Sequence, residues 1–396
     1  MKKVSIVGTG MGPETTTAEG LRAIEEAEVL LGAQRMIESF AYLGKPSFPE
    51  YSPEGVARVA AEREENSFAV LVSGDTGFYS AADGLCRELE GCETRLVPGI
   101  SSLSYFFAKI KKPWQGAALI SCHGRNMNMA DTVRRNALTF ALTGGNVKEL
   151  AEKLCAAGFA QLCVWLGEDL GQPGERVEQT TAQELAKTGA GSLSVLAVEN
   201  PEPDARVRFG IPDGEFVRGE VPMTKAEVRA VSLSRLALAP DSVCLDVGAG
   251  TGSVTVEMAL AAYAGHVCAV EREEDALGLI RENCRKFHLG NVEVVRGSAP
   301  EALEAIPPVD AAFIGGSGGK LREITALLLA KNPQTRLVVN AIAIETACEA
   351  SEILKENGLE PEITQLCVSR SKAAGRLHLM MAQNPIYVIS GGGKDA

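Results

Sequence analysis

The stretch Val243–Glu257 (VCLDVGAGTGSVTVE) constrains the fold of this chain more than any other. It begins with an apolar run, turns through Gly248, Gly250 and Gly252, and continues into a predicted amphipathic helix. A strand, a glycine turn and a helix in this order are typical of a nucleotide-binding βα unit. Because glycine has no Cβ, the backbone can adopt positive φ here and a ligand can lie against the peptide planes. The sequence therefore predicts an α/β fold with a cofactor site at this turn.

The acids around this turn indicate which cofactor it binds. The glycine spacing is G-x-G-x-G instead of the G-x-G-x-x-G of dinucleotide enzymes, and Asp246 stands two residues before the first glycine. A fixed anion here would repel a pyrophosphate, but it suits a cation with an amino-acid tail such as S-adenosylmethionine (SAM). Glu271 closes the next apolar run, His266–Glu271, where an acid can accept hydrogen bonds from both ribose hydroxyls. The alternative is an ordinary strand–turn–helix with a solvated aspartate.

Length and composition narrow the class of protein. A chain of 396 residues favours two domains, and 45 % hydrophobic with 23 % charged residues is typical of a soluble globular protein. The ten cysteines are scattered without metal-ligand spacing, which predicts free thiols in a cytoplasmic protein and no metal site. The start MKKVSIVGTG enters a strand directly, and no apolar run reaches membrane-spanning length. The formal charge of −12 argues against nucleic acid as a partner.

The first part of the chain repeats a strand–turn–helix pattern, which predicts a parallel sheet covered by helices. Its first predicted helix is Thr17–Leu31. Three predicted strands end in small-residue turns, at Gly8–Gly12, Ser73–Gly77 and Pro98–Ser102. Since ligands of α/β sheets bind beyond the carboxyl ends of strands, we expect these turns to line one cleft. Asp75, the acid of the second turn, would accept bonds from a ribose or cap the next helix.

A second set of predicted strands runs from Ala117 to Val198. The polar, proline-bearing segment Glu199–Arg208 (ENPEPDARVR) then interrupts the periodicity. A strand–helix pattern resumes beyond it and contains the glycine turn described above. We therefore expect a first domain of two α/β subdomains over 1–200 with a break near 113–116, a linker over 201–208, and a second domain over 209–396.

Two segments of this acidic chain carry a local excess of basic side chains. Ser101–Arg135 has six basic residues against the single acid Asp131, and Gln365–Met380 has three against none. Such positive patches suit a polyanionic small substrate, while a solvated surface is the alternative for each residue. The cations are Lys109, Lys111, Lys112, Arg125, Arg134 and Arg135 in the first segment and Arg370, Lys372 and Arg376 in the second.

Four motifs of the first domain, GTGMG, SGDTGF, VPGIS and TGGN in this order, resemble the tetrapyrrole (corrin and porphyrin) methyltransferases. The resemblance covers residues 2–198 and implies two α/β subdomains with SAM folded between them, held largely by backbone groups. Met11 and Thr76 depart from the family pattern, which often has proline at both places. The resemblance implies cofactor contacts at Gly10, Met11, Gly74, Asp75, Ser101, Ser102 and Thr143, and substrate carboxylates at Lys109, Lys111, Lys112 and Arg125.

The second domain resembles a different family. Its segment FGIPDGEFVRGEVPMTKAEVR (Phe209–Arg229), followed by LDVGAGTGSVTVE, RGSAPEAL and AAFIGGSGG, is similar to the decarboxylating precorrin-6 methyltransferases of cobalamin biosynthesis. The match spans most of 210–392 and implies a class I Rossmann-like fold with adenine beside the loop that follows the predicted strand Val292–Val295. The implied cofactor contacts are Thr224, Gly248, Ala249, Gly250, Thr251, Gly252, Glu271, Gly297, Ser298 and Ala299, in addition to Asp246 from the charge argument.

A chain that joins both families resembles the fused decarboxylating methyltransferases of that pathway, whose halves catalyse successive steps. The resemblance implies two SAM sites, an anionic precorrin substrate and a homo-oligomer. It also implies methylation at the 15 position with loss of carbon dioxide from the ring C acetate in the second domain, and methylation at the 5 position in the first. The alternatives are a fused methyltransferase for another tetrapyrrole or a small metabolite, a nicotinamide-dependent oxidoreductase, and a non-catalytic binding protein.

The sequence contains no nucleophile–histidine–acid set, and its four histidines are isolated. Methyl transfer to an electron-rich carbon depends on positioning and exclusion of water more than on acid–base chemistry, so this observation agrees with a methyltransferase. No catalytic residue is therefore assigned. Anchoring of substrate carboxylates or contact with solvent is expected for the polar residues near the motif ends, which are Lys225, Arg229, Asn340, Arg370 and Arg376.

Overall fold

A computed structural model describes residues 1–122 and 127–393. The chain forms two compact units: unit 1 comprises residues 1–126, 136–152 and 161–201, and unit 2 comprises residues 127–135, 153–160 and 202–396. The last change of unit falls between Pro201 and Glu202, inside the polar segment that interrupts the sequence periodicity. The inclusion of two short earlier pieces in unit 2 is a feature that the sequence did not indicate.

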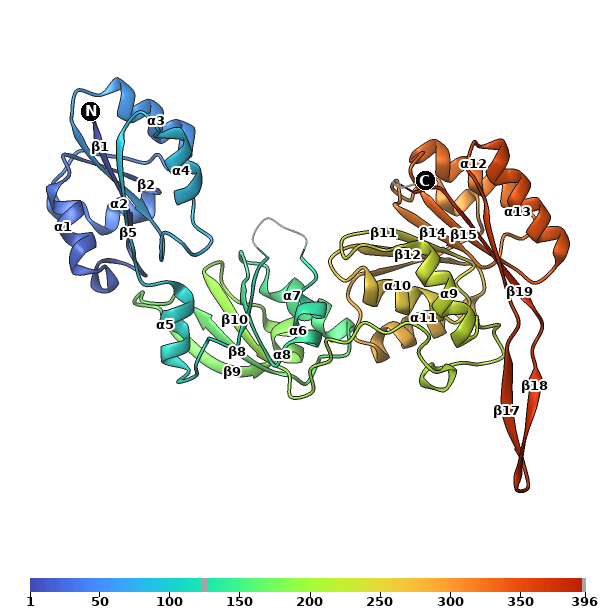
Figure 1. Cartoon of the computed structure of the whole chain (residues 1–396). Coiled ribbons are helices and arrows are strands. Elements are labelled where there is room, and N and C mark those ends of the chain that lie inside the picture. The colour runs from blue at the N-terminus through green and yellow to red at the C-terminus, as the bar shows by residue number, and fades with distance from the viewer. Residues whose placement is uncertain (123–126, 394–396) are drawn as a thin grey trace. The chain divides into compact units, whose positions relative to one another are not determined.

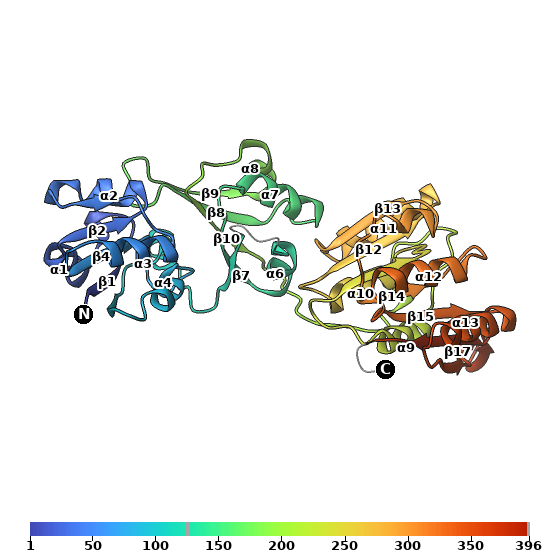
Figure 2. The same ribbon diagram turned by 90° about the horizontal axis from the view of Figure 1, so that it is seen from above.

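The first subdomain of unit 1 contains β1 Lys3–Gly8, α1 Ala18–Glu26, β2 Val29–Gly32, α2 Gln34–Ser39, β3 Ser47–Phe48, α3 Pro53–Glu62, β4 Ser67–Val72, α4 Ala82–Glu88 and β5 Glu93–Val97. Its five strands form an all-parallel sheet in the order β3-β2-β4-β1-β5. The inner strands β1, β2 and β4 are largely apolar and buried because helices cover both faces of the sheet (Figures 1 and 2). Phe68 and Leu85 belong to the core under α3 and α4, and Ile24 and Phe40 to the core under α1 and α2.

The predicted helix Thr17–Leu31 is too long, because its second part is a strand. α1 ends at Glu26, and all four residues of β2, Val29–Gly32, are buried. A short apolar run that is buried on both faces is typical of an inner strand of a parallel sheet. Counting apolar residues at helical spacing could not separate this run from the end of the helix.

The second subdomain of unit 1 contains a mixed sheet in the order β6-β7-β10-β8-β9. Only β6 and β7 pair in parallel, and the other neighbours are antiparallel. Phe106, Phe107 and Phe140 form the centre of its core. The strand β9 was not predicted, because its sequence RVEQTT is polar and half-exposed at the sheet edge. The elements are α5 Ser102–Lys109, β6 Ala118–Ser121, β7 Leu138–Leu142, α7 Val147–Ala156, β8 Cys163–Glu168, β9 Arg176–Thr181, α8 Ala182–Thr188 and β10 Ser194–Glu199.

Unit 2 contains α6 Met129–Arg135, α9 Ala226–Leu236, β11 Val243–Val247, α10 Ser253–Ala261, β12 His266–Glu271, α11 Glu274–Lys286, β13 Val292–Arg296, β14 Ala311–Ile314, α12 Leu321–Lys331, β15 Arg336–Ala341, α13 Ile344–Glu356, β16 Glu362–Leu366 and β19 Ile386–Gly391. The sheet order is β13-β12-β11-β14-β15-β19-β16, with β11 to β15 parallel and β19 antiparallel. Residues of α9 and α10 pack on one face, around Val256 and Phe313, and residues of α12 and α13 on the other, around Leu245 and Ile324. This layered sheet confirms the predicted α/β class.

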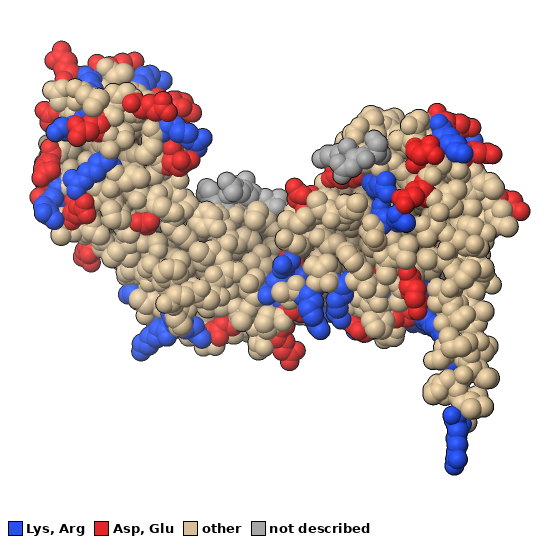
Figure 3. Space-filling view, viewed as in Figure 1, with Lys and Arg blue, Asp and Glu red and all other residues tan. Residues whose placement is uncertain are grey.

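A two-stranded hairpin, β17 Ser369–Ala374 and β18 Leu377–Ala382, extends from the seven-stranded sheet of unit 2 (Figure 1). Every residue of β18 is exposed. Basic side chains lie toward its tip, and the rest of its surface is mostly uncharged (Figure 3). An isolated two-stranded hairpin is only marginally stable in water. In the described part of the chain, no helix combines the length and apolarity needed to cross a membrane.

Candidate cofactor and substrate sites

A cavity of about 1050 Å³ opens at the carboxyl ends of the parallel strands of unit 2. The loops that follow β11, β12, β13 and β14 all reach it, because parallel strands deliver their following loops to one edge of a sheet. These loops contribute Gly248–Gly250, Glu271–Glu273, Gly297–Ala299 and Gly315–Gly318 to the lining. The first three stretches contain predicted cofactor contacts. The fourth stretch belongs to the motif AAFIGGSGG, but none of its residues was predicted to contact the cofactor. A glycine-rich turn directly after a strand is the same signal as the turn at Gly248.

The glycine turn after β11 has no room for side chains. Gly248, Gly250 and Gly252 all have positive φ, at 73°, 55° and 76°. A Cβ on Gly248 would lie 3.0 Å from the backbone of Gly316, and a Cβ on Gly250 would lie 2.9 Å from the carbonyl oxygen of Pro222. Glycine is therefore required at these positions by both conformation and space.

Glu271 is fixed against this turn by backbone groups. Its Oε2 accepts a hydrogen bond from Gly250 N (2.9 Å), and its Oε1 accepts from Arg272 N (2.7 Å) and Glu273 N (3.1 Å). The carboxylate lines the cavity. A carboxylate offers about four acceptor sites, so these three bonds orient the group and leave it able to accept a further bond from a ligand.

Asp246 does not lie where the charge argument expects it. Its side chain is fully buried and is not part of the cavity lining. Its Oδ2 accepts a hydrogen bond from Thr255 Oγ1 (2.5 Å), and its Oδ1 has no hydrogen-bond partner among the described residues. Burial raises the pKa of this carboxyl to about 7, which disfavours its charged form. The expected fixed anion facing a cationic cofactor is therefore replaced by a buried, weakly acidic group behind the turn.

The other predicted cofactor contacts of unit 2 fall into two groups, those that line the cavity and those that do not. Thr224, Ala249 and the loop Gly297–Ala299 line the cavity. Thr251 and Gly252 do not line it: the Thr251 hydroxyl is buried without a partner in the described chain, and Gly252 is the residue directly before α10. The small loop after β13 agrees with the implied place for a flat ring.

A buried arginine holds the wall of this cavity. Arg229, fully buried on α9, donates from Nε to Glu257 Oε1 (2.8 Å) and from Nη1 to Asp213 Oδ1 (3.1 Å). The same Nη1 donates to the carbonyl oxygen of Thr224 (2.5 Å), and Nη2 donates to that of Ile211. Thr224 lines the cavity, so the guanidinium fixes the backbone of its wall. Sequence reasoning placed Arg229 at the surface or on a substrate carboxylate, and this expectation is wrong.

Glu257, the partner of Arg229, is also fully buried and was not selected from the sequence. It accepts hydrogen bonds from the backbone N–H groups of Gly210 (2.7 Å) and Ile211 (2.9 Å) in addition to the arginine. Burial raises its pKa, and Arg229 opposes this shift. In the sequence, Glu257 directly follows the mainly apolar segment Val254–Val256 at the start of a predicted helix. This position was the signal that could have identified it.

The three glycine turns of unit 1 lie against one another. Gly10 N donates to Gly74 O (3.1 Å), and Gly74 N donates to Gly10 O (2.9 Å). A Cβ on Gly99 would lie 2.2 Å from Gly74 O and 2.5 Å from Gly8 O. The first, second and third turns are thus packed backbone to backbone, and no larger residue fits between them.

Asp75 connects two of these turns through its carboxylate. Its Oδ1 accepts from Gly77 N (2.8 Å) and its Oδ2 from Gly99 N (3.0 Å). These two bonds stabilise the turns, and they leave the carboxylate able to accept a further bond from a ligand, since a carboxylate offers about four acceptor sites.

The remaining predicted contacts of unit 1 also use their side chains internally. Ser101 Oγ accepts from Ser104 N (3.1 Å) and caps α5, whose first residue is Ser102. Thr143 Oγ1 donates to Ser194 O (2.8 Å). The remaining contact, Met11, packs beside the aromatic core, and its carbonyl oxygen accepts from Gln172 Nε2. What these residues leave for a ligand is mainly backbone, as the resemblance implied.

The predicted basic patch over Ser101–Arg135 is largely neutralised. Lys111 has positive φ and forms no ion pair within the described chain, and Arg125 lies outside the described residues. The other cations are paired with acids, two of them with acids that are distant in sequence, so counting local charge overestimated the patch. The pairs are Lys109–Glu175 (2.5 Å), Lys112–Glu199 (3.0 Å) and Arg134–Asp131 (2.6 Å), with Arg135 at 3.9 Å from Asp131. Arg370 of the second segment pairs with Asp213 (2.9 Å) and Glu227 (2.5 Å).

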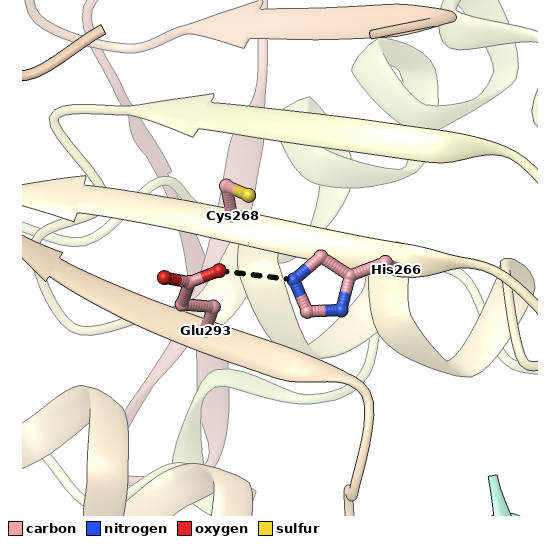
Figure 4. Close-up of side chains that lie close together, drawn as sticks. All are labelled: His266, Cys268 and Glu293. Carbon is pink, nitrogen blue, oxygen red and sulfur yellow. Dashed lines mark hydrogen bonds and ion pairs between the residues drawn. The ribbon is translucent and has the colours of Figure 1, made fainter. Parts of the chain in front are cut away.

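His266, Cys268 and Glu293 gather on β12 and β13 (Figure 4). Their potential ligand atoms lie within 4.8 Å of one another, and His266 Nε2 is 3.4 Å from Glu293 Oε2. Burial raises the pKa of the Cys268 thiol to about 11, which disfavours the thiolate that metals prefer. The three residues lie near the amino-terminal ends of β12 and β13, whereas the glycine turn lies at the carboxyl ends of the parallel strands. We assign no function to this group.

Comparisons with known proteins agree with the two-part organisation. The family described as Tetrapyrrole (Corrin/Porphyrin) Methylases matches residues 3–186, and the family described as Precorrin methyltransferase domain matches residues 215–391. A probable cobalt-precorrin-6B C(15)-methyltransferase (decarboxylating) of Pyrobaculum calidifontis is 45 % identical over 46 % of this chain and 94 % of its own length. A solved structure of a precorrin-6Y C5,15-methyltransferase from Geobacter metallireducens is 38 % identical and covers 46 % of this chain and 97 % of its own, with a TM-score of 0.45.

One relative matches along both units. The precorrin-6Y C(5,15)-methyltransferase [decarboxylating] of a Sinorhizobium species is 32 % identical over 357 residues, which is 86 % of this chain and 85 % of the relative. The order of the two family matches along the chain is the order predicted from the motifs. The chain therefore belongs to the precorrin-6Y C(5,15)-methyltransferase (decarboxylating) family of SAM-dependent enzymes.

Proposed function

We propose that this chain catalyses two successive methyl transfers of corrin biosynthesis. Unit 2 methylates the 15 position of (cobalt-)precorrin-6B and removes the ring C acetate carboxyl as carbon dioxide. Unit 1 then methylates the 5 position of (cobalt-)precorrin-7 to give (cobalt-)precorrin-8. The observation that carries the proposal is the cavity at the glycine turn of unit 2, with Glu271 fixed at its edge, in a chain of this family.

The residues around the cavity of unit 2 fit SAM. Gly248 and Gly250 line the cavity with backbone groups, because a Cβ on either residue would meet neighbouring backbone. Glu271 retains acceptor capacity for a ribose, and the small loop Gly297–Ala299 admits a flat base. When bound, SAM supplies the methyl group from its sulfonium. We propose that Thr224, Gly248, Ala249, Gly250, Glu271, Gly297, Ser298 and Ala299 hold it, and that Asp246, Thr251 and Gly252 support the turn from behind.

We propose a second SAM site in unit 1, at the meeting point of its three turns. The mutual hydrogen bonds of Gly10 and Gly74 and the close approach of Gly99 support it, because they bring backbone groups of separate strands together. Asp75 and Ser101 would act by fixing the turns. Met11, Ser102 and Thr143 complete the proposed site.

The chain contributes positioning and exclusion of water in both steps. A partly reduced tetrapyrrole is nucleophilic at its meso carbons, so the acceptor needs no strong base to attack a methyl group. In the decarboxylation, the C–C bond to the carboxylate breaks, its electron pair moves into a conjugated ring imine, and the remaining carbon takes up a proton. Holding the reactants in line can contribute about 7–11 kcal/mol. This agrees with a cavity whose lining consists mostly of small, aliphatic and amide groups, with charged residues such as Lys225 and Glu271 among them.

The test is turnover of purified protein with labelled SAM and precorrin-6B. We expect a product that has gained two methyl groups and lost one carbon dioxide, identified by mass. Labelling of uroporphyrinogen III instead of precorrin-6B would indicate a different tetrapyrrole acceptor. Thermal stabilisation by NAD, with none by S-adenosylhomocysteine (SAH), would revive the oxidoreductase alternative and contradict the proposal.

We also propose a homo-oligomer in which the β17–β18 hairpin is covered by another copy. Four large apolar side chains of β18, Leu377, Leu379, Met380 and Met381, are 68 %, 52 %, 66 % and 51 % exposed. Large apolar residues gathered on one exposed strand are typical of an association surface. The acidic net charge supports the absence of a nucleic-acid partner, and the ten free cysteines support a cytoplasmic location. Light scattering of the full chain measures its oligomeric state.

A further inference from the structure

The cavity of unit 2 has a second half that lies away from the glycine turn. In the sheet order, β14 separates β11 from β15, β19 and β16. The carboxyl end of β15, the end of β16 and the start of β19 contribute to this half of the lining. Its residues are the aliphatic Ile342, Leu366, Val368 and Ile386 together with Asn340.

The two halves of the cavity differ in chemistry. The half at the glycine turn contains the acids Glu271 and Glu273. Among the described residues that line the second half, none is acidic; carboxamides and aliphatic side chains predominate. Ile342 is 68 % exposed, which leaves a large apolar side chain uncovered at the cavity. An apolar surface beside a cofactor site suits the flat face of a ring system.

Asn340 provides a polar group in this apolar half. Its Oδ1 lies 3.0 Å from Ser232 Oγ, a hydroxyl that also lies 2.8 Å from the carbonyl oxygen of Val228. Its Nδ2 is buried and has no hydrogen-bond partner among the described residues. Buried donors without a partner are rare in native structures, and each requires an explanation. A ligand acceptor that enters the cavity would provide the missing partner.

Lys225 directly precedes helix α9, whose face toward the cavity includes Val228. Val228 and Ser232 are four residues apart, so they share this face of the helix. Lys225 and Val228 line the cavity, and Ser232 contacts Asn340. Lys225 forms no ion pair within the part of the chain that the structure describes. The ammonium of Lys225, the apolar side chain of Val228 and the amide of Asn340 therefore line the same cavity.

We propose that the second half of the cavity is the acceptor subsite, and that it binds a flat tetrapyrrole through its carboxylate side chains. The ring lies against Ile342, Leu366, Val368 and Ile386. One substrate carboxylate accepts from Asn340 Nδ2 and another pairs with Lys225. The subsite rests on the proposed function of unit 2, and it adjoins the cofactor half so that the methyl group and the acceptor carbon share one cavity.

The test uses two substitutions in the full-length chain. Asn340→Asp keeps the size of the side chain and places an anion where a carboxylate is expected, and Lys225→Met removes the ammonium. We expect each to raise the KM for precorrin-6B at saturating SAM about tenfold or more, as for loss of a charge-assisted hydrogen bond. The affinity for SAH, measured by calorimetry, is expected to stay within twofold of wild type.

Matched controls make the same charge changes outside the cavity. Gln334→Glu and Lys355→Met lie on exposed parts of unit 2, and both are expected to leave the KM unchanged. A wild-type KM in both Asn340→Asp and Lys225→Met would overturn the subsite while leaving the proposed function intact. A fall in SAH affinity that matches the rise in KM would also overturn it, because the residues would then serve the cofactor half. If the wild-type chain fails to methylate precorrin-6B, the proposed function itself is wrong.

Discussion

The two units use glycine turns at the edge of a parallel sheet in different ways. In unit 1 the turns are bonded to each other, and the acid among them, Asp75, accepts one hydrogen bond from Gly77 and one from Gly99. In unit 2 the turn faces a cavity, and Glu271 is held at its edge with acceptor capacity left. The same sequence signal thus precedes turns that are packed backbone to backbone in one unit and a turn that lines a cavity beside a positioned carboxylate in the other.

This difference determines which substitutions should disable each unit. A backbone site is broken by adding atoms to a glycine, whereas a side-chain site is weakened by removing one charge. Unit 2 has an additional weak point, because its cavity wall depends on the buried pair of Arg229 and Glu257. Substitutions of glycines and of charged residues therefore distinguish these cases.

The largest effect is expected from Arg229→Met in unit 2. This change leaves Glu257 buried without its cation, which costs about 3–5 kcal/mol of unfolding free energy. Calorimetric unfolding should show the transition of unit 2 shifted down and that of unit 1 unchanged. Arg235→Met on the same helix is the control, since its pair with Glu362 is largely exposed (side chains 35 % and 53 %) and is expected to contribute about 1 kcal/mol or less. Equal shifts in the two variants would contradict this role of Arg229.

Gly99→Ala should disable unit 1 alone. The new Cβ would lie 2.2 Å from Gly74 O and would push the turns apart. A displacement near 1 Å can reduce a rate about a hundredfold, so methylation at the 5 position should fall by that factor while methylation at the 15 position continues. Gly91→Ala, where no atom lies within 4 Å of the new Cβ, is the matched control. Accumulation of the 15-methylated, decarboxylated intermediate is the readout, and unchanged formation of the doubly methylated product would refute the prediction.

Glu271→Gln should weaken cofactor binding in unit 2 about tenfold. The substitution replaces a charged acceptor of the ribose hydroxyl by a neutral one, and the two kinds of hydrogen bond differ by about 1–1.5 kcal/mol. Calorimetric titration with SAH measures it. Glu293→Gln, at the opposite edge of the same sheet, serves as control. Equal SAH affinities for the two variants would show that Glu271 does not contact the cofactor.

The smallest effect concerns pH and Asp246. Its native pKa of about 7 lies above the ordinary value of 3.8, so the native state binds the proton more tightly than the unfolded state. The resulting stabilisation is complete below about pH 4 and is lost as pH rises through 7, which amounts to about 1.4 kcal/mol between pH 6 and pH 8. Asp246→Asn should remove this dependence in thermal melts of unit 2. It should change SAH affinity less than Glu271→Gln does, and the reverse order would restore the direct contact expected from the sequence.

The sequence predicted well whatever depends on local backbone chemistry. The strand, glycine turn and helix of Val243–Glu257 and the position of Glu271 at the end of β12 followed from spacing alone. Charges were harder to predict, because their partners are distant in the chain. Lys112 pairs with Glu199, and Arg229 with Glu257. No periodicity marks such pairs, so both cations were placed on a substrate or at the surface.

Asp246 shows a second limit. Its proximity to the turn in sequence was taken as proximity to the cofactor, but the last residues of a strand alternate between the two faces of the sheet. Its side chain points toward α10 and bonds to Thr255 instead of facing the cavity. The β17–β18 hairpin was missed for a different reason, since none of its residues is buried and burial is what creates a readable pattern.

The central claim is that each unit has its own SAM site. Calorimetric titration of the full chain with SAH tests it most directly, together with Gly99→Ala and Gly250→Ala, whose new Cβ would lie 2.9 Å from Pro222 O. The account predicts two SAH molecules per chain, with each variant losing one and keeping the other. One molecule per wild-type chain, or loss of both in a single variant, would contradict it.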